Sequence, residues 1–256
     1  MKESVRLSGW GSVTDCGSPD QRMAGPGVDE PEIFTHAGLR HATQAARLCG
    51  LAAEQAREGA GYPPETLACV FSSALGELEI TDQICSTLAE QPLALSPVLF
   101  HNSVHNAASG YWAIAAQSRN PCRAVAAGPF SYAMGLLTAL GQVQAEPGTP
   151  VLYVYYEMAV PDRFRLVYGS PPARATAFIL ASAESAGPGS GPGPLLVFEI
   201  APCGTRKPRD PATPGRPDPL PGTGRVEALT FLNGTFPLSE EHDLSLALSP
   251  CGSSPA

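Results

Sequence analysis

Two histidines near the middle of the chain are the first residues whose spacing could support chemistry. His101 and His105 stand four positions apart, which on a helix places both imidazoles on one face, where they can bind a metal. No glutamate occupies the base position between them, no third ligand follows, and Asn102-Ser103 favours a loop. Helix capping or loop hydrogen bonding is therefore the alternative. We expect no metal site and no cofactor.

Ser109 and Ser131 are the nearest candidates for a nucleophile. A serine hydrolase of the α/β type presents its serine in a GxSxG elbow, with a histidine and an acid as partners. The sequence has no such motif, and neither serine has an obvious partner. Glu157 and Asp162 lie near a predicted strand end and could act as acid and base, although solvated loop carboxylates are far more common. An independent serine hydrolase or acyltransferase stays as the alternative function.

Glycines and cysteines favour ordinary structural roles. The glycine-rich segment 187–193 misses the dinucleotide fingerprint because Pro192 replaces the last glycine, and it precedes a strand instead of following one. The seven cysteines form no CxxC pair and are odd in number. Reduced, buried thiols are therefore expected in place of a disulfide framework or a metal site.

Composition restricts the class of protein. The 256 residues, 43% of them hydrophobic, suit one globular domain. The net charge of −8 argues against nucleic acid or an anionic membrane as the main partner, since both attract clustered cations. The N-terminus lacks the apolar core of a signal peptide, and no run approaches the ~20 apolar residues of a membrane span. We expect a cytoplasmic protein.

The elements that must position these residues alternate between strands and helices over residues 1–200, which predicts a layered α/β domain. Strands are expected at 5–10, 67–72, 123–127, 150–157, 176–182 and 195–200, and helices at 35–58, 76–89, from 106 onward and at 130–143. Residues 201–256 are rich in Pro and Gly, which predicts a largely disordered tail with one weak strand-like patch at 226–232.

One stretch combines a strand, a sharp turn and a helix. Residues 123–127 are the nearly uncharged run RAVAA, typical of a strand buried on both faces. Gly128-Pro129 turns the chain into the helix at 130–143. Many α/β enzymes place a nucleophile at such an elbow, where the helix N-terminus favours negative charge. Here the elbow has no cysteine, and Ser131 lies two residues past the proline.

The segments NSVHNAASGYW (102–112) and RAVAAGP (123–129) resemble the N-terminal half of β-ketoacyl synthases of the thiolase superfamily. More closely, the chain resembles the short synthase-like proteins called chain length factors of bacterial aryl polyene gene clusters, over about residues 5–200. The resemblance implies a thiolase-like half-fold. Its sheet would be mixed, mostly parallel and five-stranded, with helices on both faces, and would span a synthase-like domain of residues 1–200.

The same resemblance assigns the elbow. In a working ketosynthase this position holds the acyl-accepting cysteine, because the helix N-terminus lowers the thiol pKa and its N–H groups stabilise the oxyanion. The position falls on Pro129, or on Gly128 if the register slips by one. The paired histidines of such enzymes belong to a C-terminal half, whereas after Ile200 this sequence has only His242. The resemblance therefore implies a protein with no catalytic residue.

A half-fold without a nucleophile implies a partner, a full-length β-ketoacyl synthase in an obligate heterodimer, with acyl carrier protein reached through that partner. The resemblance implies that strand 123–127 pairs across the dimer axis and that the preceding helix borders the partner's acyl tunnel. The candidates for the interface and tunnel floor are Phe100, His101, Asn106, Tyr111, Trp112, Phe130 and Tyr132. Two alternatives stay open: the aromatic side chains pack the domain's own core, or the chain is a purely structural subunit.

Overall fold

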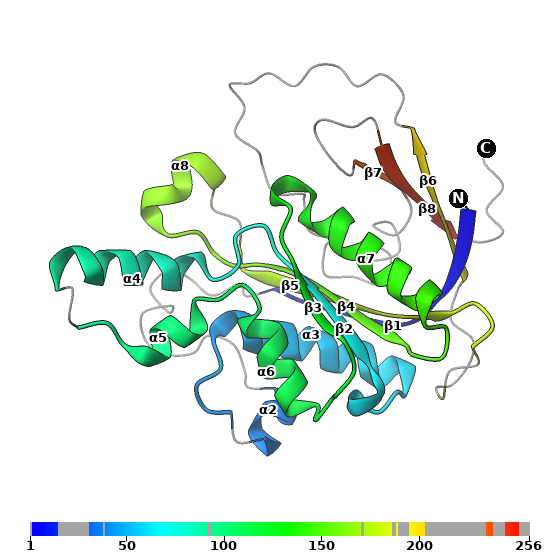
Figure 1. The fold of residues 1–256 in the computed structure, drawn as a ribbon, viewed down its shortest axis with the longest axis horizontal. Coiled ribbons are helices and arrows are strands. Elements are labelled where there is room, and N and C mark those ends of the chain that lie inside the picture. Colours follow the sequence, from blue (N-terminus) through cyan, green and yellow to red (C-terminus); the bar gives the residue numbers. More distant parts are fainter. Residues whose placement is uncertain are drawn as a thin grey trace.

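A single mixed sheet with helices on both faces forms the molecule (Figure 1). The computed structural model describes residues 2–14, 31–37, 39–91, 94–169, 172–185, 188, 195–202, 234–237 and 244–250. The strands are β1 (Lys2–Thr14), β2 (Ala68–Ser72), β3 (Cys122–Val125), β4 (Val151–Glu157), β5 (Arg174–Ser182), β6 (Leu195–Pro202), β7 (Gly234–Pro237) and β8 (Leu244–Pro250). The helices are α2 (Glu32–His36), α3 (Gln44–Ala60), α4 (Leu78–Glu90), α5 (Pro97–Asn102), α6 (Ala107–Ala115), α7 (Ser131–Ala145) and α8 (Arg165–Tyr168), with short 3₁₀ turns η1 (Pro64–Thr66), η2 (Gly128–Phe130) and η3 (Asp162–Phe164).

The strands lie in the order β3-β2-β4-β5-β1-β6-β8-β7. β2 pairs in parallel with β3 and β4, whereas β5 is antiparallel to both β4 and β1. Four of the first five strands therefore run in one direction, and the predicted mixed, layered α/β half-fold is confirmed. The predicted count of five strands needs correction, because the described sheet has eight. Beyond β1 it continues through β6, β8 and β7, all antiparallel, since a free edge of β1 offers unpaired backbone groups to β6.

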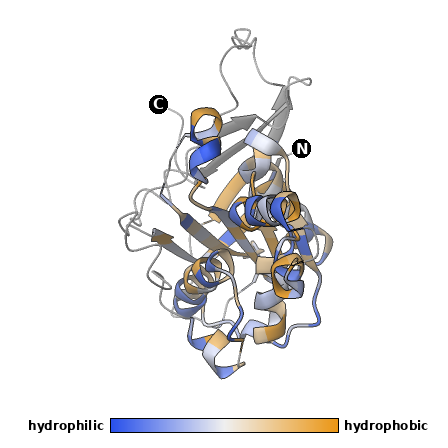
Figure 2. Cartoon of the chain, turned by 90° about the vertical axis from the view of Figure 1, so that its left-hand side faces the viewer, coloured by the Kyte–Doolittle hydropathy of each residue, from blue (hydrophilic) through white to orange (hydrophobic). Residues whose placement is uncertain are grey.

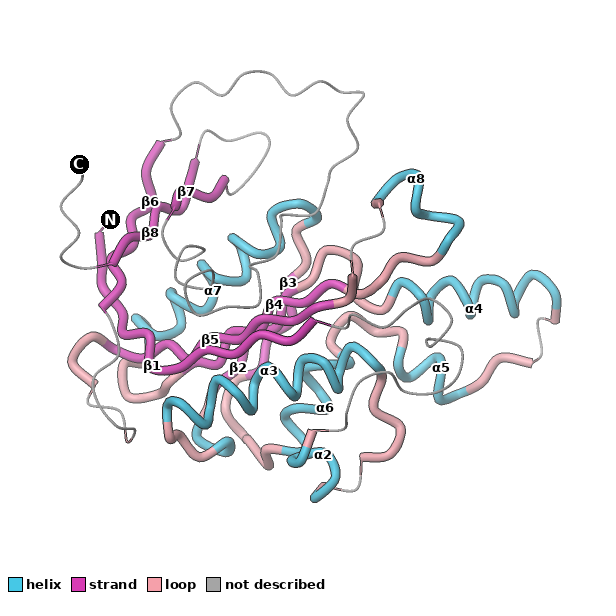
Figure 3. The backbone as a smooth tube through the Cα atoms, turned by 180° about the vertical axis from the view of Figure 1, so that it is seen from behind, coloured by secondary structure: helices cyan, strands magenta, loops and turns pink. Residues whose placement is uncertain are grey.

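The helices divide into two layers. α3 and α6 lie against one face of the sheet, with α2 packed on these two helices, and α7 lies against the other face (Figures 1 and 3). Each layer has its own cluster of buried hydrophobic side chains, and the helices carry both hydrophobic and hydrophilic residues (Figure 2). Such amphipathic helices need one face covered and one in water.

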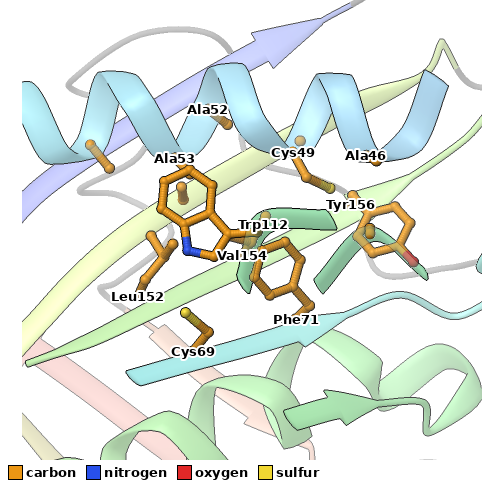
Figure 4. Packing of buried hydrophobic residues seen from close by; sticks show 14 of the residues in the cluster. Ala46, Cys49, Ala52, Ala53, Cys69, Phe71, Trp112, Leu152, Val154 and Tyr156 are labelled. Carbon is orange, nitrogen blue, oxygen red and sulfur yellow. The ribbon is translucent and has the colours of Figure 1, made fainter. Parts of the chain in front are cut away.

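α3 packs closely against the sheet at β1. Its small residues Cys49, Ala52 and Ala53 lie over the bulky Trp112, and Ala46 lies by Tyr156 (Figure 4). On β1, a register shift between residues 7 and 9 turns the strand. The two glycines at 9 and 11 then face α3, and a Cβ at the first would lie only 2.0 Å from the backbone oxygen of Ala56.

The helix predicted over residues 35–58 is wrong as a single element. The structure has α2 and α3 with a break between them, and Thr43 is the N-cap of α3. Thr43 is extended, with ψ 163°, and its side chain accepts a hydrogen bond from the Ala46 N–H at 3.0 Å. A capping threonine of this kind starts a helix, so the hydrophobic periodicity continues across a break that only the cap reveals.

The prediction that β3 is buried on both faces is wrong in the isolated chain. Cys122, Arg123 and Ala124 are exposed, and Val125 is half-buried. The reason is position: β3 is the edge strand and has only β2 beside it. The sequence shows that residues 123–127 carry little charge, but it does not show whether other elements cover this strand.

Part of the predicted tail joins the sheet. β7 pairs with β8, and β8 pairs with β6 along seven residue pairs. The strand-like patch at 226–232 lies outside the described residues, and the domain boundary at residue 200 stays a prediction. Among the described helices, none has the length and apolar character that crossing a membrane requires.

Candidate functional site

The carboxyl ends of β2, β3 and β4 meet at one edge of the sheet. Because the three strands are parallel neighbours, the segments that leave them come together: residues 73–77 after β2, the elbow after β3, and residues 158–161 after β4. In open α/β sheets this edge is where ligands bind. The candidate site is therefore assembled here.

The elbow after β3 is a tight turn that the Ser131 hydroxyl holds with two hydrogen bonds. Gly128 has φ 53°, a left-handed conformation that favours glycine, and Pro129 follows inside the turn η2. The Ser131 hydroxyl donates to the Gly128 carbonyl at 2.7 Å and accepts from the Ala127 N–H at 2.9 Å. Pro129 has no N–H to offer and Ser131 is fully buried, so neither can act as a nucleophile in this conformation.

Ser109, the other serine candidate, is also buried and engaged. Its hydroxyl donates to the Asn106 carbonyl at 3.0 Å, one turn back in the same segment. This geometry is that of a helix-start hydrogen bond. The structure brings no histidine or acid to either serine, among the contacts of the described residues, and so offers the hydrolase alternative no support.

The segment after β2 is held by a buried carboxylate. Glu157, at the end of β4, accepts hydrogen bonds from the Ala74 N–H at 2.5 Å and the Ser73 hydroxyl at 3.2 Å. Burial raises the pKa of Glu157 to about 7, against the lowering effect of these hydrogen bonds. The other predicted acid–base residue, Asp162, forms an ion pair with Arg165 at 2.7 Å and is exposed. Glu157 therefore links the end of β4 to the segment that follows β2.

His101 and His105 do not lie on one helix face. His101 lies in α5, exposed, with its ring 6.4 Å from that of Tyr111 and edge-on to it. His105 lies between α5 and α6, and its Nε2 contacts the Ser73 carbonyl at 3.1 Å. The described residues contain no group of three side chains that could hold a metal ion. The helix spacing that suggested a shared ligand set is broken because α5 ends at Asn102.

The seven residues predicted to line an interface and tunnel differ in burial and in the face of the sheet on which they lie. Trp112 and Tyr132 are fully buried, and they belong to the hydrophobic clusters on opposite faces of the sheet. Phe100 is 62% exposed on α5. Of the remaining four residues, His101 and Asn106 are exposed, whereas Tyr111 and Phe130 are buried. Their role toward a partner stays a prediction.

A cleft of about 540 Å³ lies at the same edge and was not anticipated from the sequence. It opens between the start of α3, the start of α4, the end of α5 and the segment after β4, and Glu77 lines it. Burial raises the pKa of Glu77 to about 7, against the hydrogen bond from Thr43. The only indication in the sequence was that Glu77 follows an apolar strand by five residues. The neighbouring residues in the sequence do not show whether such a carboxylate is buried or solvated.

Two cysteines are neighbours across β2 and β3. Cys69 and Cys122 are register partners; Cys69 is buried and Cys122 is exposed. The hydrogen bond from the Cys69 thiol lowers the pKa of Cys122 to about 7. The expectation of buried thiols holds for Cys49 and Cys69 but is wrong for Cys122 and also for Cys85, which is exposed on α4.

β3, the elbow and α7 all lie within a region that matches a known protein family. The model of the β-ketoacyl synthase N-terminal domain matches residues 39–189, more than half of the chain. The chain belongs to this β-ketoacyl synthase family. Within the match, β3, the Gly128-Pro129 elbow and α7 form the strand, turn and helix that the sequence indicated. Among curated proteins, none matches the sequence.

Solved structures share the fold of this synthase-like chain. One is the ketosynthase ApeO in complex with its chain length factor ApeC from Xenorhabdus doucetiae, with 22% identity and a TM-score of 0.62; the match covers 96% of this chain and 99% of that chain. The ishigamide ketosynthase/chain length factor has 16% identity and a TM-score of 0.58, covering 78% and 67%. AntDE:AntF, a type II polyketide synthase acyl carrier protein in complex with its ketosynthase, has 12% identity and a TM-score of 0.57, covering 79% and 71%.

Proposed function

We propose that this chain is a non-catalytic chain length factor that forms a heterodimer with a full-length β-ketoacyl synthase. It shapes the acyl tunnel in which that partner extends a polyene or fatty acyl chain on acyl carrier protein. The observation that carries the proposal is the ketosynthase-like elbow with Gly128-Pro129 at its apex and a buried, engaged Ser131 behind it. An elbow without a thiol or a free hydroxyl has no group to accept an acyl chain. A cytoplasmic location is part of the proposal.

The exposed edge of β3 supports the proposal that a partner binds this chain. Cys69 N–H donates to the Pro121 carbonyl and Ser73 N–H to the Val125 carbonyl, so odd-numbered positions of β3 bond to β2. By the alternation of a strand, the backbone N–H and C=O groups of residues 122, 124 and 126 face outward. The side chains there are small and uncharged at Ala124 and Ala126. Arg123, the one charged residue of β3, bonds to Gln142 of α7. An edge whose outward backbone groups stay unpaired is a template for pairing with another chain.

The heterodimer is tested by co-expression with a full-length β-ketoacyl synthase from the same genome. We expect co-purification as a one-to-one complex in size-exclusion chromatography with light scattering. Ala124→Pro removes an outward N–H without touching the β2 ladder and should abolish the complex, whereas Ala124→Ser keeps the N–H and should bind. Circular dichroism checks that both variants fold. A monodisperse wild-type monomer that does not bind the ketosynthase would refute the proposal.

The tunnel role is tested at Phe100, because Phe100 is exposed and can change without opening the core. Phe100→Ala should shift the length of the acyl products while the partner ketosynthase is acylated at the normal rate. Mass spectrometry of carrier-bound products gives the first quantity and intact-protein mass the second. Unchanged product lengths in the Phe100→Ala complex would favour the purely structural subunit.

A further inference from the structure

Cys69 and Cys122 have the geometry of a pair that a disulfide can join. They are register partners on the parallel strands β2 and β3. Neighbouring strands lie about 4.8 Å apart, and disulfides join residues whose Cα atoms are about 4.4–6.8 Å apart. Two cysteines that stand opposite each other on adjacent strands therefore fall within the range of a disulfide.

Both side chains point to the face of the sheet that α6 covers. Cys69 lies in the hydrophobic cluster that contains Trp112 of α6 (Figure 4). The Cys122 thiol donates a hydrogen bond to the Ser109 carbonyl of the same helix at 3.5 Å. The two thiols also hydrogen-bond to each other. The sulfur atoms are thus in contact on one face of the sheet, which is the arrangement that S–S bond formation needs.

The two thiols differ in their access to solvent. Cys122 is exposed on the edge strand β3, whereas Cys69 is 1% exposed. The hydrogen bond from Cys69 lowers the pKa of the Cys122 thiol, and the same bond together with burial raises the pKa of Cys69 well above its ordinary value. The thiolate is the form of cysteine that oxidants attack, so Cys122 is the reactive member of the pair.

We propose that Cys69 and Cys122 are a peroxide-sensitive thiol pair, in which Cys122 is oxidised first and Cys69 then closes a disulfide between β2 and β3. The Cys122 thiolate attacks one oxygen of hydrogen peroxide, the O–O bond breaks, and the departing hydroxide takes up a proton and leaves as water. The Cys69 sulfur then attacks the sulfenic sulfur of Cys122. The S–O bond breaks, and the hydroxyl leaves with the proton of the Cys69 thiol as a second water.

This modification site goes beyond the proposed function and does not depend on it, because every contact that carries it lies within this chain. An exposed, low-pKa thiol beside a second thiol that can resolve its sulfenic acid is typical of reversible redox sensors. The disulfide would join the edge strand β3 covalently to β2. Dithiothreitol should reduce it and restore both thiols.

The test treats the full-length chain with hydrogen peroxide in the presence of dimedone, which traps sulfenic acids. The wild type should lose two thiols and about 2 Da of intact mass. Because the chain has seven cysteines, non-reducing peptide mapping should then identify Cys69 and Cys122 as the linked pair. Cys69→Ala should instead accumulate the dimedone adduct on Cys122, and Cys122→Ala should leave the buried Cys69 reduced. The matched control Cys85→Ala, at an exposed position on α4 outside the sheet, should form the disulfide as the wild type does.

Three results would overturn the thiol pair. The first is a dimedone adduct that accumulates on Cys122 as fast in the wild type as in Cys69→Ala. The second is a disulfide that links Cys122 mainly to another cysteine, and the third is oxidation of Cys122 no faster than that of the exposed Cys85. Circular dichroism checks that the variants fold, and Cys122→Ala, at an exposed position, keeps the proposal testable if Cys69→Ala does not fold.

Discussion

Glu157→Gln should remove a large pH dependence from the stability of the chain. The carboxyl of Glu157 is 3% exposed, and burial raises its pKa from 4.5 to about 7. Between these values the native protein holds a proton that the unfolded chain has released. The free energy of unfolding therefore falls as pH rises through this window, and the stabilisation is fully present only below the unfolded pKa.

The magnitude follows from the two pKa values. A difference between 4.5 and about 7 corresponds to about 3 kcal/mol in full, of which about 2.5 kcal/mol develops between pH 5 and 8. The glutamine side chain of the variant would keep an oxygen to accept the Ala74 N–H, so the variant should fold. It has no carboxyl to titrate, and its stability relative to the wild type should rise by about 2.5 kcal/mol from pH 5 to pH 8.

Urea denaturation at pH 5, 6, 7 and 8, followed by circular dichroism, gives the two stability curves. Taking the difference between variant and wild type cancels the titration of groups that both share. Glu65→Gln, at an exposed carboxylate in η1, is the control and should give a curve parallel to the wild type. Parallel curves for Glu157→Gln itself would refute the argument that burial, and not hydrogen bonding, dominates at this carboxyl.

The remaining predictions concern packing and the edge strand. Gly9→Ala should cost about 1–3 kcal/mol in urea denaturation because its Cβ would meet the Ala56 oxygen, whereas Gly141→Ala, on a helix position with open space, should be neutral or stabilising. Trp112→Ala should cost about 3–5 kcal/mol, since the indole is fully buried, and the exposed Ile114→Ala on the same helix should cost little; equal losses would contradict the burial. Cys122 should react with iodoacetamide at neutral pH, mapped by peptide mass spectrometry, and a bound ketosynthase should protect it; unchanged labelling in the complex would argue against the β3 edge as the interface.

Much of the local structure could be predicted from sequence because its determinants lie close together in the chain. β4 follows from an unbroken β-branched and aromatic run, and α7 from the helical pattern after the Gly128-Pro129 turn. The family was evident from two short motifs, and the family match over residues 39–189 confirms it. Pro129 at the elbow is likewise a fact of the sequence.

Features that depend on partners distant in the chain were missed or misplaced. α2 and α3 are separate helices, and Thr43 caps the start of α3. The hydrophobic periodicity continues across the break between them, so periodicity alone predicts one helix. Trp112 and Tyr132, both candidates for the interface and tunnel floor, lie on opposite faces of the sheet, because helices α6 and α7 pack on different sides. Spacing along the chain does not report the side of a sheet to which a crossover leads.

The sequence by itself determined that the turn between β3 and α7 holds Gly128-Pro129 and no cysteine, because residue identity is read directly from the chain. Only the tertiary structure decided that β3 is an uncovered edge and that the buried Glu77 lines a cleft. Both depend on what stands next to a residue in space. Burial, desolvation and free hydrogen-bonding edges are properties of neighbours, and neighbours are assigned by the packing of the whole sheet.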